Sequence, residues 1–367
     1  MLEGLVFGWR TAVLLVAAVQ LLAIAAALAR SMVNRAANRT LAVLLVVLAA
    51  MITPWIIGFA GFYDRWPWLT FAPFQISLAV APLFWLYAVA LVTGAWPRRG
   101  ALHLIPAAVQ LIYLSGCFLL PLEAKWAWSD RSDLAYGVLT GSALIAGFAG
   151  YGRMSRDLIS TYTAALADHV GDDHRYAPRW LRNAMIAAAI LFPIWAGYSI
   201  TGLFVPVSYH AYMGLYLTIA GVALFLAIEG WRHAALPFPR LADLATPAPA
   251  VSPGRDWQVQ GQTWAEAIRM GGWAAEPGLT LAQTARLLGT NSSHLSRALN
   301  DGLGVNFSTF INRLRAEAVA AAMADQPGHT LLDLALAAGF SSKASFNRAF
   351  SERFGAAPSA WRARLTS

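Results

Sequence analysis

Hydrophobic positions in the first 230 residues gather into seven long runs separated by shorter polar segments. A helix that crosses a bilayer needs about 20 mostly apolar residues, and each run comes close to that length. The runs are Thr11–Ala29, Leu41–Phe62, Phe71–Thr93, Ala101–Leu120, Leu134–Gly152, Asn183–Val205 and Tyr209–Ile228. We expect the first run to be a retained helix and not a cleaved signal peptide, because six further runs follow it. The pattern predicts a seven-helix transmembrane bundle over residues 1–230.

A different pattern begins after residue 230. Residues 231–256 are rich in Pro and Ala, with five prolines between Pro237 and Pro253. Alternating Pro and Ala favours an extended, semi-rigid spacer over a helix. Over residues 257–367 the apolar positions recur with a helical period, and no run is long enough to span a membrane. The chain is therefore predicted to be all-α, with a membrane bundle, a linker and a soluble helical domain.

The soluble part contains a helix, a tight turn and a second helix. A separate helix at Trp257–Met270 is expected to precede this motif. Thr280 is expected to cap the next helix, and Gly289 to take the left-handed conformation at its end. Asn291 then caps a further helix over residues 292–300. A helix, a glycine turn and a second helix form the pattern of a helix-turn-helix motif.

The same unit occurs twice. "LSRALNDGLG" (295–304) and "FNRAFSERFG" (346–355) share Arg at the third place, Ala at the fourth and Gly at the tenth, and they lie 51 residues apart. The second copy follows a helix and turn in "LLDLALAAGF" (331–340), and Ser342 is expected to cap its helix, residues 343–354. Two copies in register predict a double helix-turn-helix domain much more strongly than one copy does.

The second helix of each unit has an apolar face and a polar face. The expected inward residues are Leu295, Ala298 and Leu299 in the first unit and Phe346, Ala349, Phe350 and Phe354 in the second. The expected outward residues are Ser293, His294, Arg297 and Asn300 in the first and Ala344, Ser345, Arg348 and Ser351 in the second. The helix between the units, residues 307–324, is expected to bury Phe310, Leu314 and Ala318 and to expose Arg313 and Arg315.

Composition and charge agree with a membrane part and set its orientation. The chain is 58% hydrophobic and 13% charged, whereas soluble domains carry about 25% charged residues. Lys and Arg favour the cytoplasmic side of a membrane. With the C-terminus inside, the inner segments hold twelve of these residues: Arg30, Arg35, Arg39, Arg98, Arg99, Arg153, Arg156, Arg175, Arg179, Arg182, Arg232 and Arg240. The outer segments hold four: Arg10, Arg65, Lys125 and Arg131. The N-terminus is therefore expected outside and the C-terminus in the cytoplasm.

A few polar residues lie within the predicted spans. Gln20, Gln75 and Gln110 are expected to pair helices, with the lining of a ligand cavity as the alternative. Glu229 ends the last span and is expected to reach the cytoplasmic headgroups. The small-residue pattern "GVLTG" (137–141) favours close helix contact, either within the bundle or between two copies of the chain.

Candidate catalytic and metal chemistry is sparse. "DHVGDDH" (168–174) has carboxylates and histidines close together, but its spacing fits no metal site better than it fits a solvated loop. No nucleophile with its base, phosphate-binding loop or paired carboxylate site is recognisable. The single cysteine, Cys117, excludes an intramolecular disulfide. We expect a protein that is not an enzyme and has no cofactor.

Basic residues gather near the end of the chain. Residues 280–367 hold nine Arg or Lys and five Asp or Glu. Five of the basic residues crowd the final stretch and suit contact with phosphates: Lys343, Arg348, Arg353, Arg362 and Arg364. A plain small helical bundle is the alternative, and the outward Arg at the same place in both copies favours DNA binding. Two such helices on one face of a duplex would sit about 34 Å apart.

The soluble domain resembles the DNA-binding domain of AraC/XylS-type transcription regulators. The stretches that carry the resemblance are "LTLAQTARLLGTNSSHLSRALN", "LLDLALAAGFSSKASFNRAF" and "FGAAPSAWR". The resemblance covers about Trp257–Arg364 and implies promoter binding by two recognition helices, residues 292–300 and 343–354. It implies DNA contacts for Ser292, Ser293, His294, Arg297, Lys343, Ser345 and Arg348. Ala344 departs from the family, whose members often have Ser there.

The region before residue 257 departs from the usual family member, which has a soluble domain there. The chain instead looks like the membrane-tethered members. We therefore expect a regulator in the bacterial inner membrane whose partners are double-stranded promoter DNA, membrane lipid, a second copy in a homodimer, and an unknown small-molecule or membrane signal sensed by the bundle. The alternatives are a transporter or enzyme fused to the helical module, and a module that binds protein in place of DNA.

Overall fold

The computed structural model describes residues 5–171, 176–205, 208–244, 256–326 and 328–366. Within these ranges it contains helices and turns and no β-strand, so the all-α prediction is confirmed. The chain divides into two compact units. The first comprises Met1–Ile159 and Pro178–Arg240, and the second comprises Ser160–Ala177 and Leu241–Ser367.

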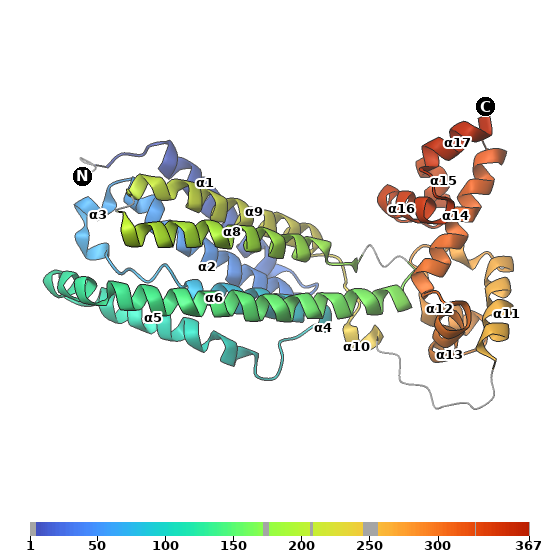
Figure 1. Cartoon of the computed structure of the whole chain (residues 1–367), viewed down its shortest axis with the longest axis horizontal. Coiled ribbons are helices and arrows are strands. Elements are labelled where there is room, and N and C mark those ends of the chain that lie inside the picture. The colour runs from blue at the N-terminus through green and yellow to red at the C-terminus, as the bar shows by residue number, and fades with distance from the viewer. Residues whose placement is uncertain (1–4, 172–175, 206–207, 245–255, 327, 367) are drawn as a thin grey trace. The chain divides into compact units, whose positions relative to one another are not determined.

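The first unit is a bundle of long apolar helices (Figure 1). Its elements are α1 (Trp9–Arg30), α2 (Arg35–Phe59), α3 (Phe62–Arg65), η1 (Pro67–Leu69), η2 (Ser77–Ala79), α4 (Val80–Thr93), η3 (Gly100–Leu104), α5 (Ile105–Phe118), the first part of α6 (Leu122–His169), α8 (Arg179–Phe204), η4 (Tyr209–Tyr212) and α9 (Met213–His233). α1 packs on α2 and α9, and α2 also packs on α4. Buried leucines such as Leu14, Leu21 and Leu45 fill these contacts.

Six described helices are long and apolar enough to cross a membrane: Trp9–Arg30, Arg35–Phe59, Gly100–Phe118, Leu122–His169, Arg179–Tyr198 and Tyr209–His233. The third predicted span is the exception, because only Ser77–Thr93 is helical there. Phe71 has a positive φ of 64°, and the stretch from Phe71 to Ile76 is not helical. In the most apolar window of α6 no residue is buried within the chain, so this apolar surface needs another apolar partner, such as lipid.

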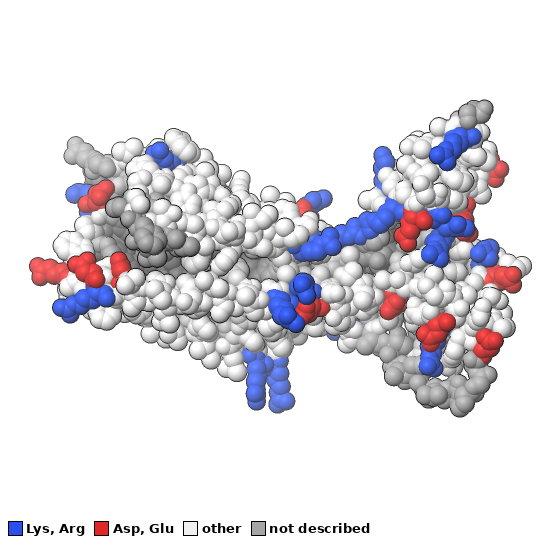
Figure 2. Space-filling view, viewed as in Figure 1, with Lys and Arg blue, Asp and Glu red and all other residues white. Residues whose placement is uncertain are grey.

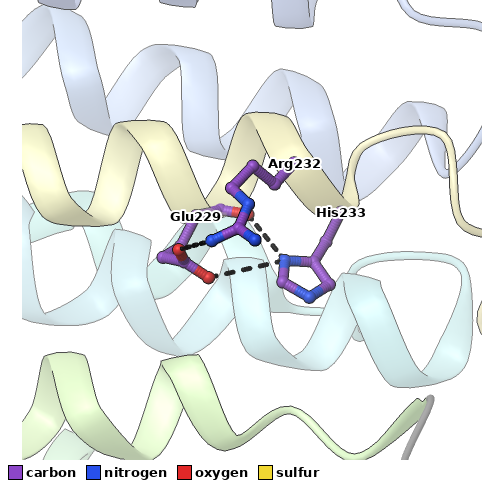
Figure 3. Close-up of polar contacts among 3 residues, drawn as sticks. All are labelled: Glu229, Arg232 and His233. Atoms are coloured by element: carbon purple, nitrogen blue, oxygen red, sulfur yellow. Dashed lines mark hydrogen bonds and ion pairs between the residues drawn. The ribbon is translucent and has the colours of Figure 1, made fainter. Parts of the chain in front are cut away.

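Charged side chains on the first unit lie toward its two ends in the view of Figure 2, and the surface between them is uncharged. Glu229 lies near one end, in the last turn but one of α9. Its carboxylate Oε1 accepts a 2.6 Å hydrogen bond from Arg232 Nη1, and its backbone carbonyl lies 2.7 Å from His233 Nδ1 (Figure 3). The charge is thus neutralised within its own helix, which suits the end of a span.

The polar residues within the spans behave differently from one another. Gln110 is buried and pairs helices: its Oε1 accepts from the Leu78 backbone N–H at 3.0 Å, and its Nε2 donates to the Tyr136 hydroxyl at 3.0 Å. The helix-pairing prediction is confirmed for this residue. Gln20 is exposed on α1, and Gln75 lies in the non-helical stretch before η2.

Part of the segment predicted as a linker, residues 231–256, is helical in the structure. α9 continues to His233, and a short helix, α10, covers Leu241–Leu244. Asn38 Nδ2 donates to the Ala234 carbonyl at 3.1 Å, and Asn34 Nδ2 donates to the Leu236 carbonyl at 2.6 Å, so the chain that leaves α9 is held by the start of α2. Residues 245–255 of the predicted spacer lie outside the described residues.

The fifth predicted span, Leu134–Gly152, is only part of a longer helix. α6 continues as one helix of 48 residues to His169. Its later turns carry a buried stripe, Ile159, Tyr162 and Leu166, at helical spacing, and Val170 just after the helix is buried as well. In the candidate metal segment, Asp168 and His169 are helical, whereas residues 172–175 lie outside the described residues. The described part of the chain contains no cluster of three or more potential metal ligands.

Candidate nucleic-acid interface

The second unit contains two copies of a helix-turn-helix arrangement joined by a longer helix (Figure 1). Its elements after α10 are α11 (Trp257–Met270), η5 (Trp273–Ala275), α12 (Leu281–Leu287), α13 (Ser292–Arg297), η6 (Ala298–Gly302), α14 (Phe307–Asp325), α15 (Leu331–Ala337), α16 (Lys343–Phe354) and α17 (Pro358–Thr366). The first copy is α12 with α13, and the second is α15 with α16. α14 lies between them in sequence and packs on both α15 and α16.

Polar side chains cap the helices of both copies. Thr280 accepts from the Gln283 N–H at 3.2 Å, and Gln283 in turn accepts from the Thr280 N–H at 2.9 Å, which completes a capping box. Four other side chains accept a hydrogen bond from the N–H three residues ahead: Asn291, Asn306, Thr330 and Ser342. Each cap contributes about 1 kcal/mol, so the helix starts are set locally, as predicted for Thr280, Asn291 and Ser342.

The two turns have the same hydrogen bonds. In the first, the Thr290 N–H donates to the Ala285 carbonyl at 2.9 Å, and in the second, the Phe340 N–H donates to the Ala335 carbonyl at 3.0 Å. The intervening glycines, Gly289 and Gly339, have φ values of 68° and 93°. This is the Schellman ending of a helix, in which a left-handed glycine reverses the chain. The turns therefore confirm that the repeat in the sequence is a repeat in the backbone.

Two hydrophobic cores support the two copies. The first contains Leu281, Leu295 and Leu299 together with the start of α14, and the second contains Leu334, Phe346 and Phe350 together with the later turns of α14. The predicted inward residues Leu295, Ala298, Leu299, Phe346 and Phe350 are all buried, while Ala349 and Phe354 are partly buried. α14 thus contributes to both cores with different parts of its length.

Two predictions for α14 are wrong. Arg315 is 1% exposed, and its guanidinium donates to the backbone carbonyls of Ala274 at 2.7 Å and Glu276 at 3.0 Å. It ties the segment around η5 to α14 and is not available on the surface. Ala318 is exposed although it was expected inside, whereas Arg313 is exposed as expected. The buried face of α14 changes along the helix because the first core ends at Leu314 and the second begins at Ala316.

The first recognition helix is shorter than predicted. α13 ends at Arg297, and the residues after it form a π-helical turn, η6. A Cβ on Gly302 would lie in contact with the Trp257 backbone carbonyl, so only glycine permits this close approach of α11 to η6. The expected helix over 292–300 is therefore α-helical only in its first part.

The expected DNA-contacting residues of the first copy lie together at α13. Ser292, Ser293 and His294 occupy its first turn and are partly exposed. Arg297 is one-third exposed, with its guanidinium carbon 5.4 Å from the centre of the Trp257 ring and its Nε 3.6 Å from a carboxylate oxygen of Asp301. The Arg297 side chain is thus held in position by α11 and by the π-helical turn.

Of the residues of the second recognition helix, α16, that are expected to contact DNA, two are exposed and one is buried. Lys343 and Arg348 are exposed on α16, as expected. The expectation that Ser345 faces outward is wrong, because Ser345 is 2% exposed and its hydroxyl bonds to the Ser342 carbonyl at 2.9 Å. The exposed polar residue that sequence reasoning missed is Asn347, which lies one helical turn after Lys343 and next to Arg348. Helical spacing from Lys343 alone would have found it.

Comparison with known proteins identifies the second unit. Residues 284–364 match the family model described as helix-turn-helix domain. The chain is 39% identical over 72 residues to uncharacterized HTH-type transcriptional regulators of Staphylococcus aureus strains MSSA476, N315 and MRSA252. That match covers 20% of this chain and 10% of the length of each relative. No solved structure matches the chain. Residues 284–364 are therefore a helix-turn-helix domain of the AraC type, and the resemblance is confirmed for this part of the chain.

Proposed function

We propose that the chain is a sequence-specific DNA-binding transcription regulator that is held in a membrane by its first unit. The observation that carries the proposal is the double helix-turn-helix arrangement: two copies, each with side-chain caps at both helix starts, a glycine turn with the same hydrogen bonds and a recognition helix. The family match to residues 284–364 supports it. A plain helical bundle would not need two copies of one turn in register.

The residues proposed to contact DNA are chosen by their exposure. Lys343, Asn347 and Arg348 share the exposed face of α16, with Ala344 between them. An Arg is suited to read a guanine through two hydrogen bonds, an Asn to read an adenine, and a Lys to contact a phosphate. In the first copy the corresponding contacts come from Ser292, Ser293, His294 and Arg297. Ser345 acts through the fold of the helix start and not through a direct contact.

Membrane attachment is supported by the apolar helices of the first unit. With the basic segments on the inner side, the helix-turn-helix unit lies in the cytoplasm, where it meets the chromosome. Lipid is then a partner of the bundle, and a ligand or membrane state that binds two bundle conformations with different affinity would regulate DNA binding. The observations favour neither a transporter nor an enzyme as the role of the bundle.

The test is the DNA affinity of Arg348→Ala. Genomic footprinting of the tagged full-length protein first identifies a target site. We expect Arg348→Ala to weaken binding to that site by about 1–3 kcal/mol and to relax specificity at one base pair. Arg269→Ala is the matched control, because it removes an exposed Arg of α11 outside the recognition helices. Base reading by Arg348 would be contradicted if Arg348→Ala bound the site as tightly as the wild type, or if Arg348→Ala and Arg269→Ala lost equal affinity.

A further inference from the structure

α6 belongs to both units of the chain. Its apolar part, with the window that has no buried residue, lies within the first unit. From Ser160 onward, the same continuous helix is part of the second unit. The chain also passes between the two units at residues 177–178 and 240–241. Among the described residues, α6 is the one helix that crosses a boundary between the units.

The end of α6 pairs with the start of the first helix-turn-helix copy. Val170 forms an antiparallel bridge with Thr280, and the Gly171 N–H donates to the Leu279 carbonyl at 3.0 Å. Thr280 is the residue that caps α12. The chain that leaves α6 is therefore hydrogen-bonded directly to the residues that position α12.

The same end also contacts α14. Ser308, in the first turn of α14, is buried, and its hydroxyl donates to the Gly171 carbonyl at 3.4 Å. A Cβ on Gly171 would lie 3.1 Å from the Leu279 carbonyl oxygen and 3.2 Å from Cγ2 of Ile311. Ile311 is fully buried in the first core. Because α14 also forms part of the second core, this contact joins α6 to the helix that connects both copies.

A polar groove extends this contact to the second recognition helix. It is lined by Ala167 from α6, by Ser308 and Asn312 from α14 with its cap Asn306, and by Arg348 and Glu352 from α16. Arg348 is the residue proposed to read DNA. One turn of α6 thus shares a groove with the second recognition helix, and the two residues after α6 are bonded to the start of the first copy.

We propose that the end of α6 together with the two residues after it, Ser160–Gly171, is the element through which the membrane-embedded helices control DNA binding. This inference rests on the proposed function and adds its route of regulation. A rotation or shift of α6 moves Gly171, and with it Leu279 and Ser308, so that the start of α12 moves relative to α14. DNA binding by two recognition helices depends on their separation and orientation. A ligand or membrane state that alters the position of α6 in the bundle would therefore alter the affinity for DNA.

A helical-phase experiment tests the proposal in the full-length protein. Insertions of two, four, five or seven alanines between Ile159 and Ser160 lengthen α6 within the helix. Each added residue rotates the rest of the helix by about 100°, so four or seven residues nearly restore the original face, and two or five residues do not. Occupancy of the footprinted site in cells is the readout. The same insertions after Ala250, in the Pro/Ala-rich linker, are the matched controls.

We expect occupancy to fall about tenfold with two or five residues in α6 and to return with four or seven. The linker insertions should leave it unchanged. Equal occupancy at every length, or a steady fall with length regardless of phase, would overturn the proposal. Arg348→Ala in the unaltered chain is measured beside them. If Arg348→Ala also leaves occupancy unchanged, the proposed function fails. If Arg348→Ala lowers occupancy but occupancy is the same at every insertion length, only the role of α6 is rejected.

A point variant provides an independent readout. Gly171→Val places side-chain atoms against Leu279 and Ile311, whereas a Cβ on Gly152, inside α6, meets no atom within 4 Å. With equal amounts of both proteins in the membrane, Gly171→Val should change occupancy about tenfold and Gly152→Val should not. Equal occupancy in the two variants would count against the contact.

Discussion

Arginine residues in the second unit have opposite roles, and burial decides between them. Arg313 and Arg315 are two residues apart on α14, yet the first is exposed and the second is 1% exposed. Arg315 donates to two backbone carbonyls of the η5 segment. Its positive charge therefore holds the fold of the unit and does not contribute to a DNA-binding surface.

Replacing Arg315 by Ala should destabilise the second unit by about 3 kcal/mol, because two buried carbonyls lose a charged donor. For a unit of this size, the loss corresponds to about 10–20 °C in melting temperature. Full-length protein in detergent is heated with a protease present, and cleavage within residues 257–367 is monitored. Arg313→Ala, on the exposed face, should melt as the wild type does. Equal melting of the two variants would show that the buried contacts contribute nothing.

Sequence reasoning placed the residues of the short helices better than those of α14. Leu295, Phe346 and Phe350 were found because each recognition helix packs against one core and has one buried face. α14 packs against two cores, so a single helical period cannot describe it, and Arg315 and Ala318 were assigned to the wrong sides. Ser345 was misplaced for a different reason: it lies in the first turn of α16, where its hydroxyl bonds to Ser342.

At the scale of elements, the two glycine turns are alike in backbone and differ in surroundings. A Cβ on Gly289 would meet nothing within 4 Å. A Cβ on Gly339 would lie 2.6 Å from the Ala275 carbonyl oxygen and 2.8 Å from its carbon. The second turn therefore packs directly against the backbone of the η5 segment, the same segment that Arg315 holds. This contact connects the second copy to the segment that precedes the first copy.

The two turns give a matched pair of variants. Gly289→Ala should cost about 1–2 kcal/mol, because a residue with a Cβ must adopt a positive φ. Gly339→Ala has the same cost and must also displace the Ala275 backbone, which adds about 1–3 kcal/mol. Protease-coupled melting of the full-length protein in detergent compares them. A larger loss for Gly289→Ala than for Gly339→Ala would contradict the close approach of η5 to the second turn.

The elements could be predicted from sequence where local signals are strong. α11 and α16 have the predicted bounds, because caps and glycines mark their ends. The end of α6 is not predicted from the sequence, although Ile159, Tyr162 and Leu166 have a helical spacing, because the charged segment 168–174 is typical of a solvated loop. No sequence signal pairs Val170 with Thr280, since that contact joins residues 110 positions apart.

At the scale of the whole molecule, the number of membrane crossings decides where the N-terminus lies. The helical part of the third predicted span, Ser77–Thr93, would extend about 25 Å, whereas the hydrocarbon core measures about 30 Å. If it crosses, seven spans place the two termini on opposite sides. If it does not, six spans place them on the same side. The six-span arrangement with a cytoplasmic C-terminus would put Arg30, Arg35 and Arg39 outside, against the positive-inside rule.

We therefore expect seven crossings, with the short third helix accommodated by local thinning of the bilayer or by the aromatic residues before it.

Reporter fusions measure the side of the membrane on which each terminus lies. β-Galactosidase fused after Ser367 should be active, because that enzyme works only in the cytoplasm, and alkaline phosphatase at the same place should be inactive. An epitope placed before Trp9 should be reached by an impermeant label in intact spheroplasts. An N-terminal epitope protected from the label would leave Ser77–Thr93 as a helix that does not cross. An active phosphatase after Ser367 would place the helix-turn-helix unit away from DNA and remove the basis of the proposed function.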